Sequence, residues 1–379
     1  MTLIDSGRTD AMRARPGTDE VPGSDDALAA YLFVYFAGED TDDGESIHLA
    51  VSRGNDALRW DDLNGGRPVL TSVHGTRGLR DPFILRSAEG DRFFLIATDL
   101  KVYPSGSFAA PQETGSRHLE IWESTDLVTW SDQRHVEVSG PEAGNTWAPE
   151  AHYDAARGEY LVYWASNLYD AGVPAAERVA TDSYNRMLCA TTRDFRTFST
   201  PQVWVDVRRG PGLGMIDSTV IEHEGVYYRA TKDEATMLPR LERSVDLRAQ
   251  VHGELPDADA ATGWALVARD LGLGQANGVG GAFTAGEGPT IFRANDGDVS
   301  TGGRPAWYLF VDQPSYHGGR GYVPFVTDDL DSGVWTSVAD RAQLPASPRH
   351  GTVLPITAGE AARVRAALGA EVPARSAVD

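Results

Sequence analysis

Hydrophobic and polar positions recur along this chain in a three-part unit. The unit opens with a short segment in which a polar or charged residue precedes apolar ones. It continues with an aromatic-rich hydrophobic strand and ends with a strand that runs into a Ser/Thr–Asp turn. The first full copy occupies 80–84, 93–98 and 118–130, and further copies begin near 147, 216 and 287. Short strands repeated in this way predict an architecture built from small sheets.

The spacing of the units favours a propeller. Equivalent starts are assigned to Asp81, Ala148, Asp217, Glu287 and His350, which are separated by 67, 69, 70 and 63 residues. A unit of this length, made of short strands with turn signals, fits a four-stranded propeller blade. An unrelated β-sandwich with chance similarity between its strands is the alternative, and the near-equal spacings disfavour it.

The two ends of the repeating region complement each other. The chain enters with 31–36 and 47–53, which match the second and third strands of the other units, and the missing first strand reappears at 350–356. We therefore predict an all-β, five-bladed β-propeller whose fifth blade is completed when the C-terminal strand pairs with the N-terminal strands. This closure removes free sheet edges.

The expected domain organisation follows from this closure. Residues 1–26 are expected to be a flexible tail, 27–357 the propeller, and 358–379 a helical cap and tail. The stretch 250–281 is rich in Gly and Asp and is expected to be a long loop.

Composition narrows the function classes. The 379 residues carry a formal net charge of −21, which disfavours nucleic acid as a partner, whereas a neutral sugar feels no such repulsion. Cys189 is the only cysteine, so an intrachain disulfide is excluded. No apolar run reaches membrane-span length, and the first thirty residues contain no apolar signal core. We expect a cytoplasmic protein without a membrane partner; its oligomeric state stays open.

Three carboxylates stand at the starts of the units. The innermost strands of a propeller surround its axis, so Asp81, Asp217 and Glu287 are expected to converge at one mouth. Isolated buried carboxylates are costly. Each carboxylate taken alone could equally cap a turn or pair with Arg80 or Arg349. The three together favour a functional site.

Residues flanking these starts are candidates for a sugar subsite. Trp147 could stack on a sugar face, and Asn145 and Arg349 could hydrogen-bond hydroxyl groups. Core packing and turn formation are the alternative roles, and for Trp147 they are as well supported as stacking.

At these residues the sequence resembles the family 43 glycoside hydrolases, which are inverting enzymes with five-bladed propellers. The resemblance extends from about Leu32 to Ile356. Its carrying segments are Arg80-Asp81-Pro82-Phe83-Ile84, Trp147-Ala148-Pro149-Glu150, Ile216-Asp217-Ser218, Glu287-Gly288-Pro289 and Arg349-His350-Gly351. The usual Asp-Pro of the third segment reads Asp217-Ser218 here. The chain is also permuted by part of a blade relative to common members.

The resemblance implies roles for these residues. Asp81 would be the general base, Glu287 the general acid, and Asp217 the residue that holds and tunes the acid. Arg80, Trp147 and Glu150 join Asn145 and Arg349 as expected substrate-binding residues. His350 matches a position associated with a central cation, often calcium, or with its water shell; a hydrogen-bonded core histidine is the alternative. No organic cofactor is expected.

Inversion requires an acid and a base separated by about 6.5–9.5 Å, so that a water fits between base and sugar. Glu287 would have to stay protonated near neutral pH, and a negative charge on Asp217 would raise its pKa. Fructan-cleaving relatives that retain configuration use an Asn-Asp nucleophile, and no convincing match precedes Asp81.

By family prevalence, the resemblance implies an exo-acting α-L-arabinofuranosidase that acts on oligosaccharides derived from plant polysaccharides. A β-xylosidase using the same carboxylates is the first alternative. A catalytically silent carbohydrate-binding propeller is the second, and the presence of all three carboxylates argues against it.

Overall fold

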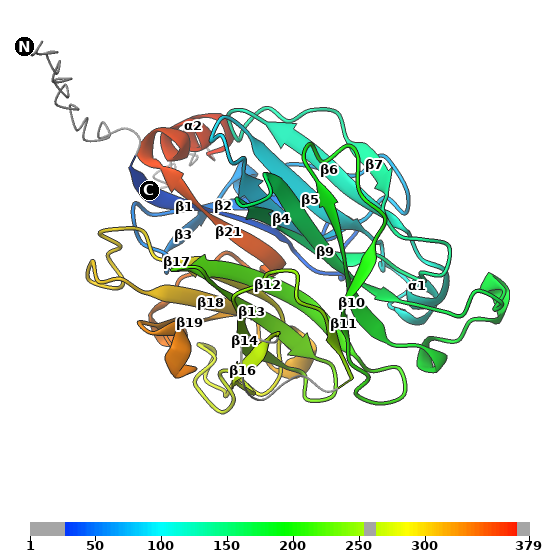
Figure 1. The fold of residues 1–379 in the computed structure, drawn as a ribbon. Coiled ribbons are helices and arrows are strands. Elements are labelled where there is room, and N and C mark those ends of the chain that lie inside the picture. The colour runs from blue at the N-terminus through cyan, green and yellow to red at the C-terminus, as the bar shows by residue number, and fades with distance from the viewer. Residues whose placement is uncertain (1–26, 254–262, 370–379) are drawn as a thin grey trace, which may run out of the picture.

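A computed structural model describes residues 27–253 and 263–369. Five small sheets form a ring (Figure 1), which confirms the predicted five-bladed β-propeller. We number the blades along the chain, beginning with the blade that contains both ends of the ring. Blade 1 consists, from the axis outward, of β21 (Arg349–Thr357), β1 (Leu28–Phe36), β2 (His48–Ser52) and β3 (Trp60–Asp62).

The other blades follow the same plan, with the first strand of each nearest the axis. Blade 2 contains β4 (Leu79–Arg86), β5 (Phe93–Asp99), β6 (His118–Ser124) and β7 (Arg134–Glu137). Blade 3 contains β8 (Trp147–Asp154), β9 (Glu159–Asn167), β10 (Asn185–Thr192), β11 (Gln202–Asp206) and β15 (Val251–His252). Blade 4 contains β12 (Met215–His223), β13 (Val226–Asp233), β14 (Leu238–Ser244) and β16 (Ala265–Ala268). Blade 5 contains β17 (Glu287–Arg293), β18 (Trp307–Gln313), β19 (Gly321–Thr327) and β20 (Thr336–Ser337).

The ring closes as the sequence predicts. β21 pairs antiparallel with β1, with Leu32 opposite Leu354 and Phe33 opposite Val353. Side chains from neighbouring blades fill the spaces between the sheets; between blades 1 and 2, for example, Leu32 and Leu49 share a core with Leu95. Burying this apolar surface stabilises the contact between blades.

Two short α-helices accompany the sheets within the described residues. α1 (Ala109–Thr114) lies in the connection between β5 and β6. α2 (Ala358–Leu368) follows β21 directly and begins with a capping box, in which Thr357 and Glu360 bond each other's backbone N–H groups. Val364 of α2 is buried in the core between blades 1 and 2.

The prediction of a long loop over 250–281 is wrong in part. Within it, Val251–His252 form β15, which runs parallel to β11, and Ala265–Ala268 form β16, which pairs with β14. Trp264, immediately before β16, is fully buried. Strands distant in the sequence supply the pairing partners, and Trp264 packs in a core with Trp204, so a local Gly- and Asp-rich composition does not reveal these strands.

Each innermost strand carries a one-residue bulge near its start. The extra residue follows Arg80, Trp147, Ile216, Glu287 and Arg349 in the five blades. The next residue has a positive φ in four of them, at Asp81, Ala148, Asp217 and Gly288. A bulge redirects side chains and is common beside active sites.

These bulges correct the equivalence assumed from the sequence. Gly288, not Glu287, occupies the position of Asp81 and Asp217, and Glu287 corresponds to Arg80 and Arg349. In blade 5, the structurally equivalent residue therefore lies one position later in the chain than the repeat spacing predicts. The shift places Glu287 beside Arg349 rather than on the innermost ring of side chains.

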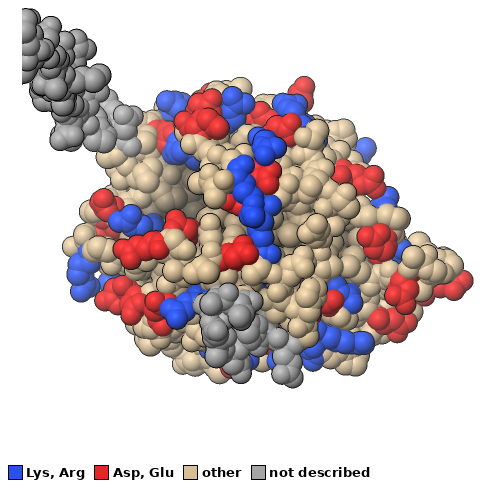
Figure 2. Space-filling view, viewed as in Figure 1, with Lys and Arg blue, Asp and Glu red and all other residues tan. Residues whose placement is uncertain are grey.

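The charges on the protein surface are mixed. On the face shown in Figure 2, acidic side chains form several separate patches with basic side chains among them. On this face, the acidic residues that contribute to the net charge of −21 are thus not concentrated in one patch. None of the helices in the described residues is long and apolar enough to cross a membrane.

Candidate active site

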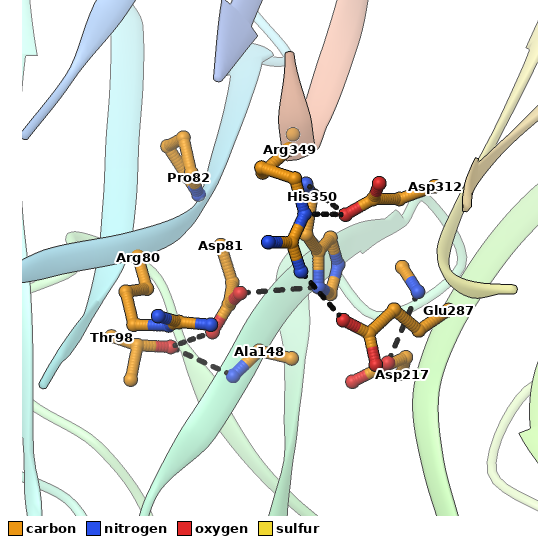
Figure 3. Close-up of polar contacts among 12 residues, drawn as sticks. Arg80, Asp81, Pro82, Thr98, Ala148, Asp217, Glu287, Asp312, Arg349 and His350 are labelled. Atoms are coloured by element: carbon orange, nitrogen blue, oxygen red, sulfur yellow. Dashed lines mark hydrogen bonds and ion pairs between the residues drawn. The ribbon is translucent and has the colours of Figure 1, made fainter. Parts of the chain in front are cut away.

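A pocket of about 370 Å³ opens where the innermost strands begin. Six residues singled out from the sequence line it: Arg80, Asp81, Trp147, Asp217, Glu287 and His350. They come from all five blades, so ring closure brings together side chains that are far apart in the chain. Figure 3 shows how most of them lie.

Asp81 is held by two side chains. Thr98 Oγ1 donates to Asp81 Oδ2 at 2.8 Å, and His350 Nδ1 lies 3.2 Å from Oδ1 (Figure 3). Thr98 Oγ1 in turn accepts from the backbone N–H of Ala148 in blade 3. Burial alone would raise the pKa of Asp81, but the charge and hydrogen bond of His350 and the charge of Arg80 outweigh it and lower the pKa. Asp81 is therefore ionised at neutral pH.

His350 is a buried cation at the centre of this group. Burial favours the neutral ring, yet Asp81 and Asp217 together raise the pKa of His350 to about 9. The protonated ring therefore neutralises part of the negative charge that the surrounding carboxylates bring to the axis.

The donor atoms around His350 can be compared with those that the expected central calcium ion would need. Calcium prefers six to eight oxygen ligands. Asp81, Asp217 and Glu150 supply carboxylates around His350, and these carboxylates favour the protonated, non-ligating form of the ring. Their oxygens fit the donor chemistry of calcium, while His350 fits the alternative role of a hydrogen-bonded core histidine. The calcium ion stays a prediction.

Asp217 stands on the innermost ring and contacts the start of β17 in blade 5. Its Oδ2 accepts from the backbone N–H of Gly288 at 3.0 Å. Burial is the largest influence and raises the pKa of Asp217; the charges of His350 and Lys232 oppose this rise, and those of Glu287 and Asp81 add to it. The carboxyl of Asp217 therefore gains a proton more readily than an exposed aspartate.

Glu287 contacts two cations and a phenol. Lys232 Nζ lies 2.9 Å from Oε2, Arg349 donates to Oε1 at 2.9 Å, and Tyr316 OH donates to Oε1 at 3.2 Å. Burial would raise the pKa of Glu287, but Lys232 and Arg349 together lower it well below its usual range. The expectation that Glu287 stays protonated near neutral pH is thus wrong for the unliganded protein, because these cations outweigh the repulsion from Asp217.

The two arginines expected to bind substrate are engaged with protein carboxylates. Arg80 pairs with Glu39 and Glu45, and Arg349 bridges Glu39, Glu287 and the buried Asp312. Arg349 does not line the pocket. Pairing with Arg349 is an alternative role that the sequence allows for each carboxylate, and Glu287 does pair with Arg349.

The three remaining predicted residues differ in position. Trp147 lines the pocket and packs edge-on against Phe108, with ring centroids 6.2 Å apart. Asn145 is fully buried outside the pocket wall and binds the backbone N–H of Asn167, a structural contact. Glu150 also lies behind the wall, where burial raises its pKa to about 8. Direct contact of Asn145 or Glu150 with a sugar in this pocket is therefore not supported by the geometry.

Comparison with known proteins identifies the family. A family model described as a probable glycosyl hydrolase domain, related to glycosyl hydrolase family 43, matches residues 26–362. The chain is a family 43 glycoside hydrolase. An α-L-arabinofuranosidase from Bifidobacterium longum subsp. longum is 34% identical over 297 residues. That match covers 73% of this chain and 26% of the relative, so the chain spans about a quarter of the relative's length.

Solved structures of the family are more distant. An exo-β-1,3-galactanase from Clostridium thermocellum is 15% identical with a TM-score of 0.43, covering 68% of this chain and 48% of the other. An α-L-arabinofuranosidase from Lactobacillus brevis is 16% identical with a TM-score of 0.41, covering 68% and 72% of the two chains.

Several residues that line the pocket of this family 43 chain were not predicted from the sequence. They are the polar residues Gln112, Lys232, Glu234 and Tyr316 and the apolar residues Leu100, Phe108, Leu213, Ile216 and Met237. The sequence does carry a signal for Lys232, because it is one of only two lysines in the chain and stands near the end of a strand. The others stand on β-strand ends and connections whose position relative to the axis depends on ring closure.

Proposed function

We propose that this protein is an exo-acting, inverting α-L-arabinofuranosidase. The main support for this proposal is that one small pocket contains the ionised Asp81 and the carboxyl of Glu287, which stand on different blades. Two carboxyl groups of this kind suffice for inverting hydrolysis. The arabinofuranosidase name of the 34% identical relative supports the choice of sugar.

In the proposed reaction, Asp81 removes a proton from a water that attacks the anomeric carbon. Glu287, once protonated, transfers its proton to the leaving oxygen, and the glycosidic bond breaks with inversion. His350 and Thr98 keep Asp81 oriented and charged, while Asp217 opposes ionisation of Glu287.

The acid must first take up a proton, because Lys232 and Arg349 keep Glu287 charged in the unliganded protein. A bound sugar excludes water from the pocket, and this desolvation favours the neutral, protonated form of Glu287. We therefore propose that activity is highest in acidic solution and that substrate entry assists protonation of Glu287.

A panel of nitrophenyl glycosides tests the choice of sugar. α-L-Arabinofuranoside should be cleaved in preference to β-D-xylopyranoside and β-D-galactopyranoside. Preferential release from xylopyranoside would replace the arabinofuranosidase with the β-xylosidase, and binding without cleavage of any glycoside would favour a silent carbohydrate-binding propeller.

Proton NMR of the first-formed sugar tests the stereochemistry. Inversion predicts that α-L-arabinofuranosides release β-arabinofuranose first. Early appearance of the retained anomer would rule out Asp81 as the base of a single-displacement reaction.

A further inference from the structure

A second cluster of ionisable side chains lies on blade 2, outside the pocket wall. Glu120 on β6 stands opposite His135 on β7 and opposite Ala97 on β5. Because side chains alternate along a strand, Asp99, two residues after Ala97, shares their face. Potential ligand atoms of Asp99, Glu120 and His135 all lie within 4.8 Å of one another.

The two carboxylates of this cluster are deeply buried. Asp99 is 2% exposed and Glu120 is fully buried, and their face continues into the apolar core between blades 1 and 2. No Arg or Lys within 27–253 and 263–369 lies within ion-pair distance of either carboxylate. Two buried carboxylates without a permanent cation are costly. A cation bound at this position would offset that cost.

The hydrogen bonds leave one carboxylate oxygen available. Thr76 donates to Asp99 Oδ1 through both its backbone N–H and its hydroxyl, each at 2.7 Å. Among the described residues, nothing donates a hydrogen bond to Asp99 Oδ2. Glu120 is held by Gln133 Nε2 and by His135 Nδ1, each at 2.5 Å. Asp99 Oδ2 is therefore available as a ligand atom.

Further imidazole rings surround His135. His118 stacks on it with ring centroids 3.9 Å apart and planes 5° apart, and the ring of His74 lies 5.7 Å away. Imidazole nitrogens and carboxylate oxygens are the donors that zinc and similar ions prefer.

We propose that Asp99, Glu120 and His135 bind one divalent transition-metal ion, for which zinc is the best match. Binding releases the proton shared by Glu120 and His135, and the two ligand atoms move apart to accommodate metal bonds of about 2.0–2.2 Å. His118 stacks on the His135 ring and helps to orient it. The ion joins three strands of blade 2 at the residue next to Thr98, the partner of Asp81.

Zinc binding to the purified full chain provides the test. After treatment with a chelator, titration calorimetry with zinc chloride should show one tight site, and metal analysis after dialysis should find about one zinc per chain. Glu120→Gln and His135→Gln should each weaken the affinity by at least about tenfold, since loss even of a supporting hydrogen bond costs 10–100-fold. His252→Gln is the matched control, because His252 is exposed on β15.

The outcomes separate this site from any other. Unchanged zinc affinity in both cluster variants, or no saturable binding by the wild type, would overturn the proposal and leave a proton-sharing triad. X-ray absorption of the zinc-loaded wild type tests it without relying on folded variants. One imidazole nitrogen together with carboxylate oxygens is expected; a sulfur ligand would overturn the assignment, because Cys189 belongs to a different core.

Discussion

Lys232 is one of the two cations that hold Glu287 ionised, so replacing it should change the pH dependence of hydrolysis. Lys232 Nζ lies 2.9 Å from Glu287 Oε2. At this distance the Coulomb attraction is about 6 kcal/mol at an effective dielectric constant of 20 and about 1.4 kcal/mol in bulk water. A difference of about 1.4 kcal/mol corresponds to one pKa unit. Lys232→Met should therefore raise the pKa of Glu287 by at least about one unit.

The direction of the change in activity follows from the proposed role. Glu287 works as an acid only when protonated. Removing a neighbouring positive charge destabilises the carboxylate, so the protonated form persists to higher pH. The alkaline limb of kcat/KM should therefore move upward by at least about one pH unit.

The assay is the pH profile of kcat/KM on one α-L-arabinofuranoside, measured for wild type and variant. Lys101→Met is the matched control, since Lys101 is the only other lysine and pairs with the exposed Asp42. A lower rate with an unmoved alkaline limb would mean that Lys232 serves substrate binding alone. A limb that moved downward would refute Glu287 as the proton donor.

Four further outcomes are expected. Glu287→Ala should lose cleavage of natural oligosaccharides far more than cleavage of nitrophenyl glycosides. Asp81→Ala should lose both by about 10²–10⁴-fold, measured by kcat/KM on the two substrate types. The opposite pattern would exchange the roles of the two residues. Asp217→Ala should move the alkaline limb downward, because Glu287 loses a repulsive neighbour, and an upward shift in the pH profile would contradict this. Thr98→Val should raise the pKa of Asp81 and move the acidic limb upward, because the carboxylate loses a hydrogen bond. An unmoved limb would show that His350 and Arg80 set this pKa without Thr98. Deleting His350 onward should abolish cooperative thermal unfolding, and a soluble truncated chain with an unchanged Tm would contradict the closure.

The sequence by itself determined the repeat, the closure and the main carboxylates. Alternation of strands and turns is local, so the units can be located without the fold, and the unmatched first strand at 350–356 reveals how the ring closes. Once the innermost strands are known to surround an axis, the convergence of Asp81, Asp217 and Glu287 follows. The chain's own composition likewise excluded an intrachain disulfide.

Only the tertiary structure decided how these residues interact. The bulges shift Glu287 one position away from the ring of Asp81 and Asp217, and a repeat spacing read along the chain cannot resolve a single inserted residue. Lys232 and Arg349 reach Glu287 from two other blades and reverse the expected direction of its pKa. Such a pKa depends on charges within a few ångströms in space. Those neighbours are set by ring closure and strand pairing, and therefore by contacts between residues far apart in the sequence.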